Sequence, residues 1–267
     1  MTVFQAIVLG IVQGLAEFLP VSSSAHLTLT PFFLGWKDPG LAFDVALHFG
    51  TLVALVWYFR AEWIELTKSA IRIARTRKIQ DVHDRRLIYL IVATIPGGIA
   101  GKLLNDYAES TFRSPLLIAC TLSVMGILLW SVDRYAARVR SIEEITMRDA
   151  VLIGLAQMAA LIPGVSRSGS TITAGRALNL DRPSAARFSF LMSMPITFAA
   201  VVLKVPEAIR EADSLVPLIA GVVAAFVSSW IAITVLLRYI SKHSFGVFAL
   251  YRLLLAGAVV ATILARR

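Results

Sequence analysis

Long apolar runs, separated by short polar segments, follow one another along most of the chain. Residues 115–132 and 215–237 contain no charged side chain. About 20 apolar residues in a helix cross the roughly 30 Å core of a bilayer, so such a run predicts a spanning helix. The pattern predicts six of them, over residues 41–59, 87–104, 115–132, 187–204, 215–237 and 247–265.

Two shorter apolar stretches, residues 3–19 and 149–163, end in a different way. Each runs into a proline and a serine-rich segment, PVSSS at 20–24 and PGVSRS at 163–168. Interrupted segments of this kind enter a bilayer and turn back. We therefore expect two re-entrant hairpins. The first stretch does not look like a cleavable signal, because it lacks a basic start and a small-residue cleavage site.

Basic residues concentrate in two segments, residues 60–86 and 133–149, which the positive-inside rule places in the cytoplasm. Acid-rich segments mark the outer side, through Asp106, Glu109, Glu207, Glu211 and Asp213. Counting the crossings between these assignments, the first hairpin starts and ends outside, whereas the second starts and ends inside. The two hairpins are thus predicted to have opposite topology.

A shift of 144 residues relates the first half of the chain to the second. It aligns six identical pairs: Gly10 with Gly154, Gln13 with Gln157, Ala16 with Ala160, Val21 with Val165, Ser22 with Ser166, and Ser24 with Ser168. The alignment agrees with the opposite topology deduced from charge. The sequence therefore predicts an all-α integral membrane protein with one domain. Two inverted repeats, residues 1–140 and 141–267, would bring the broken segments together near the bilayer midplane.

Composition agrees with a membrane protein and excludes several other classes. Hydrophobic residues make up 57% of the chain and charged residues only 16%, whereas soluble domains are about one quarter charged. The net charge is +9, but the basic residues cluster between the apolar runs, as membrane topology requires. Nucleic-acid binding is therefore not expected. The one cysteine, Cys120, lies inside an apolar run and predicts neither a disulfide nor a thiolate metal site. Nucleotide-binding and haem motifs are absent from the sequence.

The first polar constellation lies in the stretch VQGLAEFLPVSSSAH, residues 12–26. Gln13 and Glu17 are four residues apart and project from one helix face. Pro20 then breaks that helix and leads into Ser22, Ser23, Ser24 and His26. Ionisable groups at membrane depth are costly and usually belong to a pathway or a site. The structural alternative is that Glu17 only pairs with an arginine.

The second constellation lies in the stretch PGVSRSGSTIT, residues 163–173, and its polar members are Ser166, Arg167, Ser168, Ser170 and Thr171. Two glycines bracket the arginine and let backbone N–H groups approach an anion closely. The rigid guanidinium fork suits phosphate oxygens. The pattern favours a phosphate site. The structural alternative is that Ser-Arg-Ser caps a helix.

The two stretches resemble, in order, the two signatures of the undecaprenyl-diphosphate phosphatase, or bacitracin-resistance, family. The similarity extends through FDVALHFGTLVAL at 43–55 and FSFLMSMP at 188–195. It implies hydrolysis of undecaprenyl diphosphate to undecaprenyl phosphate and inorganic phosphate, in the bacterial inner (plasma) membrane, which recycles the lipid carrier for cell-wall synthesis. Many members carry a glutamate where this chain has Gln13. Glu17 would then be the only acid of a metal-binding pair.

The resemblance and the residue types together give a hypothesis for each side chain. Glu17 and Gln13 would hold a divalent cation, Mg²⁺ or alternatively Ca²⁺. Ser23 or water would attack, and His26 would transfer the proton; whether Ser23 or His26 is the nucleophile stays open. The diphosphate would be bound by Ser22, Ser166, Arg167, Ser168, Ser170 and Thr171. Asp44 and His48, four residues apart, either pair structurally or support the cation or His26.

Two other classes of function compete with the enzyme. A polyprenyl-phosphate transporter or flippase would use a similar anion site, and inverted repeats are typical of transporters. It has no evident use, however, for adjacent Glu17, Ser23 and His26. A structural scaffold leaves both polar stretches unexplained. The expected partners are the polyprenyl diphosphate and membrane lipids, with a homodimer by analogy only. Because the first hairpin enters from outside, we expect substrate access from the outer face.

Overall fold

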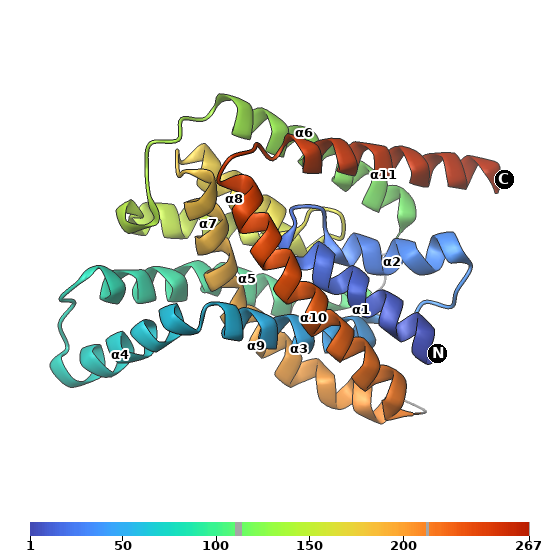
Figure 1. The fold of residues 1–267 in the computed structure, drawn as a ribbon, viewed down its shortest axis with the longest axis horizontal. Coiled ribbons are helices and arrows are strands. Elements are labelled where there is room, and N and C mark those ends of the chain that lie inside the picture. The colour runs from blue at the N-terminus through green and yellow to red at the C-terminus, as the bar shows by residue number, and fades with distance from the viewer. Residues whose placement is uncertain (110–113, 212–213, 267) are drawn as a thin grey trace.

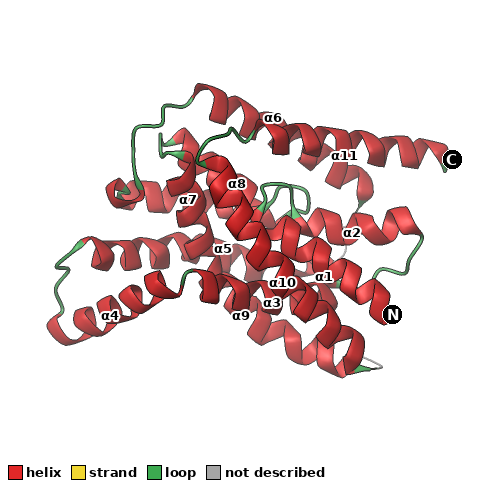
Figure 2. Cartoon of the chain, in the orientation of Figure 1, coloured by secondary structure: helices red, strands yellow, loops and turns green. Residues whose placement is uncertain are grey.

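The computed structural model describes residues 1–109, 114–211 and 214–266, and the side chains of residues 1–103, 114–210 and 214–266. Within these ranges the chain forms helices and connecting turns, apart from an isolated bridge between Arg140 and Leu180 (Figure 2). The α-helices are α1 Val3–Phe18, α2 Ser23–Leu34, α3 Leu41–Tyr58, α4 Arg60–Thr76, α5 Val82–Glu109, α6 Pro115–Tyr135, α7 Met147–Met158, α8 Arg167–Ala177, α9 Arg182–Glu211, α10 Leu215–Ile240 and α11 Gly246–Ala265.

Among the described residues, six helices are long and apolar enough to cross a membrane: α3, α5, α6, α9, α10 and α11. They coincide with the six predicted runs, so the prediction of a polytopic membrane protein is confirmed. The candidate spans in α5 and α9 begin at Val82 and Arg182, earlier than predicted, because their first turns are polar and a hydropathy criterion misses them. Of the residues used to define the outer side, Asp213 and the side chains at Asp106, Glu109 and Glu211 lie outside the described part.

Each interrupted segment forms two short helices joined by a turn. Helices α1 and α2 are joined by residues 19–22, and α7 and α8 by residues 159–166, which include one 3-10 turn. Figure 1 shows the two connecting turns, one blue and one yellow, beside each other at the centre of the molecule. The structure therefore brings together two segments that are about 140 residues apart in the sequence.

The basic segment 60–86 contains a helix that the hydropathy pattern did not predict. Helix α4 buries Leu66 and Ser69 and leaves most of its other residues exposed or half-buried. Arg72 on this helix pairs with Asp84 at the start of α5 and with Asp81. This ion-pair cluster fastens the two helices together where they meet.

Close packing of α1 and α7 depends on glycines. A Cβ on Gly10 would lie 2.2 Å from the carbonyl oxygen of Gly221 on α10, and one on Gly154 would lie 2.6 Å from that of Ala93 on α5. Small residues permit such close helix contacts in membranes. Helix α1 thus packs on α10 in the way that α7 packs on α5.

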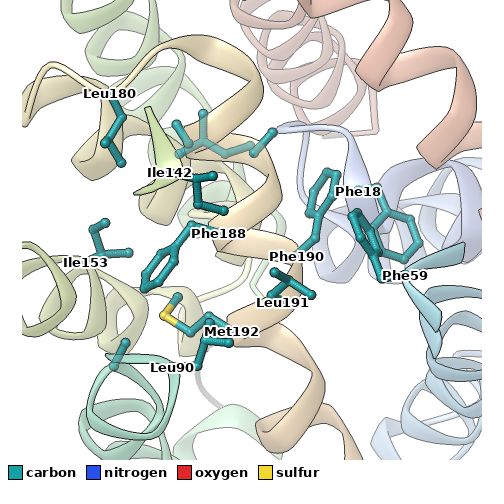
Figure 3. Packing of buried hydrophobic residues seen from close by; sticks show 14 of the residues in the cluster. Phe18, Phe59, Leu90, Ile142, Ile153, Leu180, Phe188, Phe190, Leu191 and Met192 are labelled. Atoms are coloured by element: carbon teal, nitrogen blue, oxygen red, sulfur yellow. The ribbon is translucent and has the colours of Figure 1, made fainter. Parts of the chain in front are cut away.

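The largest apolar core lies next to the end of α1. Figure 3 shows Phe18, Phe59 and Phe190 gathered from α1, the end of α3 and α9. The ring centroids of Phe18 and Phe190 are 5.3 Å apart with the rings nearly perpendicular, a favourable edge-to-face arrangement. This packing fixes the end of α1, and with it the neighbouring side chain of Glu17.

Candidate active site

The last residue of each central turn is a serine with nearly the same positive φ. Ser22 has a φ of 75° and Ser166 a φ of 74°, values that residues other than glycine rarely adopt. Each serine is the N-cap of the following helix. The Ser22 side chain accepts from the N–H of Ala25 at 3.4 Å, and that of Ser166 from Gly169 at 3.0 Å. Ser166 thus caps a helix, as the capping alternative for the second constellation expected, and its phosphate-binding role stays a prediction.

Hydrogen bonds tie one turn to the other. The N–H of Gly164 donates to the Ser22 hydroxyl at 3.0 Å. In the reverse direction, the Ser168 hydroxyl donates to the carbonyl oxygens of Glu17 at 3.2 Å and Leu19 at 3.1 Å. Ser22 and Ser168 are almost fully buried. Both serines were predicted to bind phosphate, whereas the structure places them in the junction between the turns.

Glu17 is the centre of the polar cluster beside these turns. Its carboxylate accepts from Gln13 Nε2 at 3.0 Å and from Ser23 Oγ at 2.6 Å, and it pairs with the guanidinium of Arg167. His48 Nε2 on α3 lies 3.3 Å from Glu17 Oε2. Four helices therefore contribute to one carboxylate, which is 7% exposed. The structural alternative, a pairing of Glu17 with an arginine, is realised, and its partner is the residue predicted to bind phosphate.

This cluster borders a cavity of about 190 Å³. Its polar wall includes Glu17, Ser23, Ser24, His48, Ser166 and Arg167. Ser23 and Ser24 are the first two residues of α2, and Arg167 is the first residue of α8. Helix N-termini carry unpaired N–H groups and a partial positive charge, and two helices begin at this cavity. Together with the guanidinium, they make the cavity suited to an anion.

His26 lies elsewhere. Its Nδ1 is 2.7 Å from the carbonyl oxygen of Ser22, and its Nε2 is 2.7 Å from the hydroxyl of Tyr251, on whose ring it stacks. The histidine that borders the cavity is His48 instead. Nδ1 of His48 donates to the main-chain oxygen of Asp44 at 2.8 Å, which directs Nε2 toward Glu17. The proton-transfer role of His26 stays a prediction.

Two further residues predicted to bind phosphate make internal hydrogen bonds. The hydroxyls of Ser170 and Thr171 donate to the carbonyl oxygen of Arg167 at 3.1 and 2.7 Å, and Thr171 is also 2.6 Å from the hydroxyl of Ser189. Neither borders the cavity. They fix the first turn of α8, and so the position from which Arg167 extends. Thr197 on α9 accepts from that guanidinium at 3.3 Å.

Sequence analysis missed one charged residue at this junction. Arg252 of α11 is fully buried and donates to the carbonyl oxygens of Pro20, Gly164 and Val165, which belong to both turns. Its position inside the predicted span 247–265 was a signal, because a charged residue at membrane depth is costly unless it has a role.

The fold and the site define a polytopic helical membrane protein whose buried carboxylate and arginine meet at an anion-suited cavity between two serine-capped turns. Comparison with known proteins places it more narrowly. A family model described as Bacitracin resistance protein BacA matches residues 6–258, so the chain belongs to this family.

Relatives agree over their whole length. A protein of Gemmatimonas aurantiaca is 71% identical over 266 residues, covering 100% of both chains. One of Moorella thermoacetica is 51% identical over 268 residues, and one of Geobacter sulfurreducens is 46% identical over 270 residues, again covering 100% of both chains. All three carry the name Undecaprenyl-diphosphatase.

Proposed function

We propose that this chain hydrolyses undecaprenyl diphosphate to undecaprenyl phosphate and inorganic phosphate, and so recycles the lipid carrier for cell-wall synthesis. The observation that carries the proposal is the contact of Glu17 with both Ser23 and Arg167 at the cavity where two helix N-termini end. A nucleophile, a proton acceptor and an anion-binding group are thereby within reach of one phosphoryl group. The name shared by the full-length relatives supports the same substrate.

The inverted repeats and re-entrant hairpins are part of this proposal. Residues 1–140 and 141–267 would form two repeats within one membrane domain. Their support is the matched φ of Ser22 and Ser166 and the corresponding packing of α1 on α10 and of α7 on α5. The bilayer-midplane location follows from the arrangement of such repeats in membrane proteins. Entry from the outer face, with the lipid tail held between helices, rests on the charge pattern of the loops.

The reaction begins with competition for Arg167. In the resting site its guanidinium pairs with Glu17, which keeps the carboxylate weakly basic. The terminal phosphate of the substrate draws the guanidinium and the free helix N–H groups toward itself. Glu17 is then a better acceptor for the Ser23 proton, 2.6 Å away between the heavy atoms. Binding of the anion therefore activates the nucleophile.

Ser23 Oγ attacks the terminal phosphorus, and its proton passes to Glu17. The bond from that phosphorus to the bridging oxygen breaks, and undecaprenyl phosphate leaves with the bridging oxygen. Water then attacks the phosphorus of the phosphoserine, the bond from that phosphorus to Ser23 Oγ breaks, and Oγ takes back the proton held by Glu17. Inorganic phosphate leaves, and the hydroxyl and the carboxylate are restored. Direct attack by water is the alternative. An acid-stable phosphate ester trapped on Ser23 supports attack by Ser23. An acid-labile adduct on His26 supports attack by the histidine. The absence of both adducts supports direct attack by water.

A divalent cation fits one side of the cluster. Among the described side chains, the Oε1 atom of Gln13 is buried without a hydrogen-bond partner, and the carboxylate of Glu17 lies beside the same amide group. Mg²⁺ takes oxygen ligands and is often held by one or two carboxylates together with substrate phosphates and water. The described residues contain no cluster of three or more acidic, histidine or cysteine groups placed for a metal. Gln13 and Glu17 would therefore hold Mg²⁺, or Ca²⁺, only together with the substrate; the bound ion would neutralise phosphate charge.

The test is phosphate release from undecaprenyl or farnesyl diphosphate by detergent-purified protein, with Mg²⁺ or with EDTA. Glu17→Ala and Arg167→Ala are expected to abolish release that the wild type performs with Mg²⁺ and loses with EDTA. A transporter would release no phosphate in detergent, where there is no membrane gradient. Absence of release from well-folded wild type, across several metals and lipids, would reject the phosphatase.

A further inference from the structure

The guanidinium of Arg252 connects α11 with three other parts of the fold: α6, the first turn and the second turn. Its Nε donates to the carbonyl oxygen of Leu122 on α6 at 3.2 Å, and its Nη1 donates to that of Pro20 at 3.0 Å. Nη2 donates to the carbonyl oxygens of Gly164 and Val165, the latter at 3.1 Å. All four recorded acceptors are main-chain oxygens. The side chain thus holds the first turn, the second turn and α6 at a fixed separation.

The groups that would react lie immediately beyond these carbonyls. Pro20 is three residues before Ser23, and Val165 is two residues before Arg167. In each turn a serine with positive φ caps the helix that follows. A displacement of Pro20 or Val165 therefore also moves the start of that helix. The distance between the hydroxyl of Ser23 and the guanidinium of Arg167 is therefore set in part from α11.

Space has been left for this guanidinium. A Cβ on Gly169 of α8 would lie 2.9 Å from Arg252 Nη1 and 2.9 Å from Ser166 Cβ, both too close. A Cβ on Gly126 of α6 would lie 3.3 Å from Arg252 Cβ, in the aliphatic part of the same side chain. Glycine is costly inside helices, so its presence at both positions agrees with a requirement for the arginine.

From these contacts we infer that Arg252 is a positioning residue, which holds the two turns in the register where Ser23 and Arg167 act on one phosphoryl group. The inference rests on the proposed function for its effect on activity, but the spacing of the turns is measurable without it. Lysine preserves the charge and lacks the planar fork, so it cannot reach all four oxygens. Arg252→Lys therefore separates geometry from charge.

The control is Arg60→Lys, in α4. Arg60 also donates to a main-chain oxygen, that of Trp57, but it is exposed and contacts neither turn nor the helices α2 and α8. Gly169→Ala is the second variant. It leaves Arg252 in place but crowds the guanidinium, while alanine favours the helix, so its effect cannot come from loss of helix stability.

The first measurement is the distance between spin labels on Leu34→Cys and Ala177→Cys, exposed positions near the ends of α2 and α8, in a Cys120→Ser background. Arg252→Lys is expected to broaden or shift the distance distribution, and Arg60→Lys to leave it unchanged. The second measurement is turnover. Misplacement by about 1 Å costs roughly 10²-fold, so kcat should fall by about that factor, with KM changed by less than about threefold.

A wild-type distance distribution in Arg252→Lys overturns the inference, whatever its activity. A changed distribution in Arg252→Lys, together with a wild type that releases no phosphate, supports the inference and rejects the phosphatase. If Arg252→Lys does not fold, Arg252→Gln, which keeps two N–H donors on a planar group, decides by the same distance measurement. If Arg252→Lys folds, it is combined with Gly169→Ala. A double variant no more affected than Arg252→Lys alone assigns the action of Gly169→Ala to the guanidinium, whereas additive effects assign it to Ser166 and count against the inference.

Discussion

The two central turns end in the same kind of serine cap and carry different chemistry. In each, a serine with positive φ caps a short helix, and the hydroxyl two residues later lies 3.2 Å from the cap hydroxyl. The first residue of the helix, however, is Ser23 in one turn and Arg167 in the other. Six residues before these positions stand Glu17 and Leu161 respectively.

This difference divides the work between the turns. The first supplies the carboxylate and the hydroxyl that would take part in bond making, and the second supplies the cation that would hold the phosphate. A symmetric pair could provide only two copies of one function at the cavity. Two similar turns with different side chains at corresponding positions place complementary groups at one cavity.

Exchanging the two first-turn residues breaks the comparison most severely. The double variant Ser23→Arg, Arg167→Ser keeps the composition of the cavity but moves the hydroxyl next to Leu161, which has no carboxylate. Loss of the arginine contact to phosphate alone is worth about 10³–10⁵-fold, so phosphate release should fall by about 10⁴-fold. Activity within tenfold of wild type would show that the two positions are interchangeable. Arg167→Lys keeps a positive charge at position 167 and so separates loss of the planar guanidinium from displacement of the charge.

Removing only the hydroxyl tests the reacting half of the comparison. Ser23→Ala should lower kcat by about 10³-fold, because it removes the nucleophile while leaving the other site groups in place. Ser24→Ala, which removes a hydroxyl one residue further along the same helix, should change kcat by less than about tenfold. The measurement is steady-state phosphate release. Equal effects of the two variants would favour attack by water.

The amide pair Gln13 and Gln157 sharpens the comparison at the metal. In the described structure both have a buried Oε1 without a hydrogen-bond partner, but only Gln13 adjoins Glu17. Gln13→Glu adds a second carboxylate there, so the Mg²⁺ concentration for half-maximal activity should fall by about tenfold. Gln157→Glu is the matched control and should leave that concentration unchanged. A shift in both variants, or in neither, would remove Gln13 from the metal site.

The smallest expected effects concern the caps. Ser22→Ala and Ser166→Ala each remove a capping oxygen, which costs about 1 kcal/mol of folding free energy. Ser22 also accepts from Gly164, so its replacement should cost about 1 kcal/mol more. Thermal unfolding of both variants in the same detergent measures the difference. A larger loss for Ser166→Ala would contradict the proposed asymmetry of the junction.

The sequence by itself determined the membrane class and the six spanning helices, because a run of apolar side chains must be buried in lipid regardless of its neighbours. It also located both turns, because each contains a proline, which cannot continue a helix: Pro20 lies two residues after the end of α1 and Pro163 five residues after the end of α7. The pairing of Glu17 with Arg167 could also have been predicted from the sequence. Opposite charges inside a membrane need partners, and these two lay in the polar interruptions.

Only the tertiary structure decided how the remaining polar groups are used. Ser22 accepts a hydrogen bond from Gly164, and Ser168 donates one to the carbonyl oxygen of Glu17. His26 contacts the hydroxyl of Tyr251, and His48 lies beside the carboxylate of Glu17. In three of these four contacts the partners are more than 140 residues apart in the sequence. Hydrophobic periodicity and local turn signals report which residues are buried, but a hydrogen bond depends on the position and direction of two groups brought together by packing. That is why the residue types predicted the chemistry, while the packing assigned each hydroxyl and imidazole to its partner.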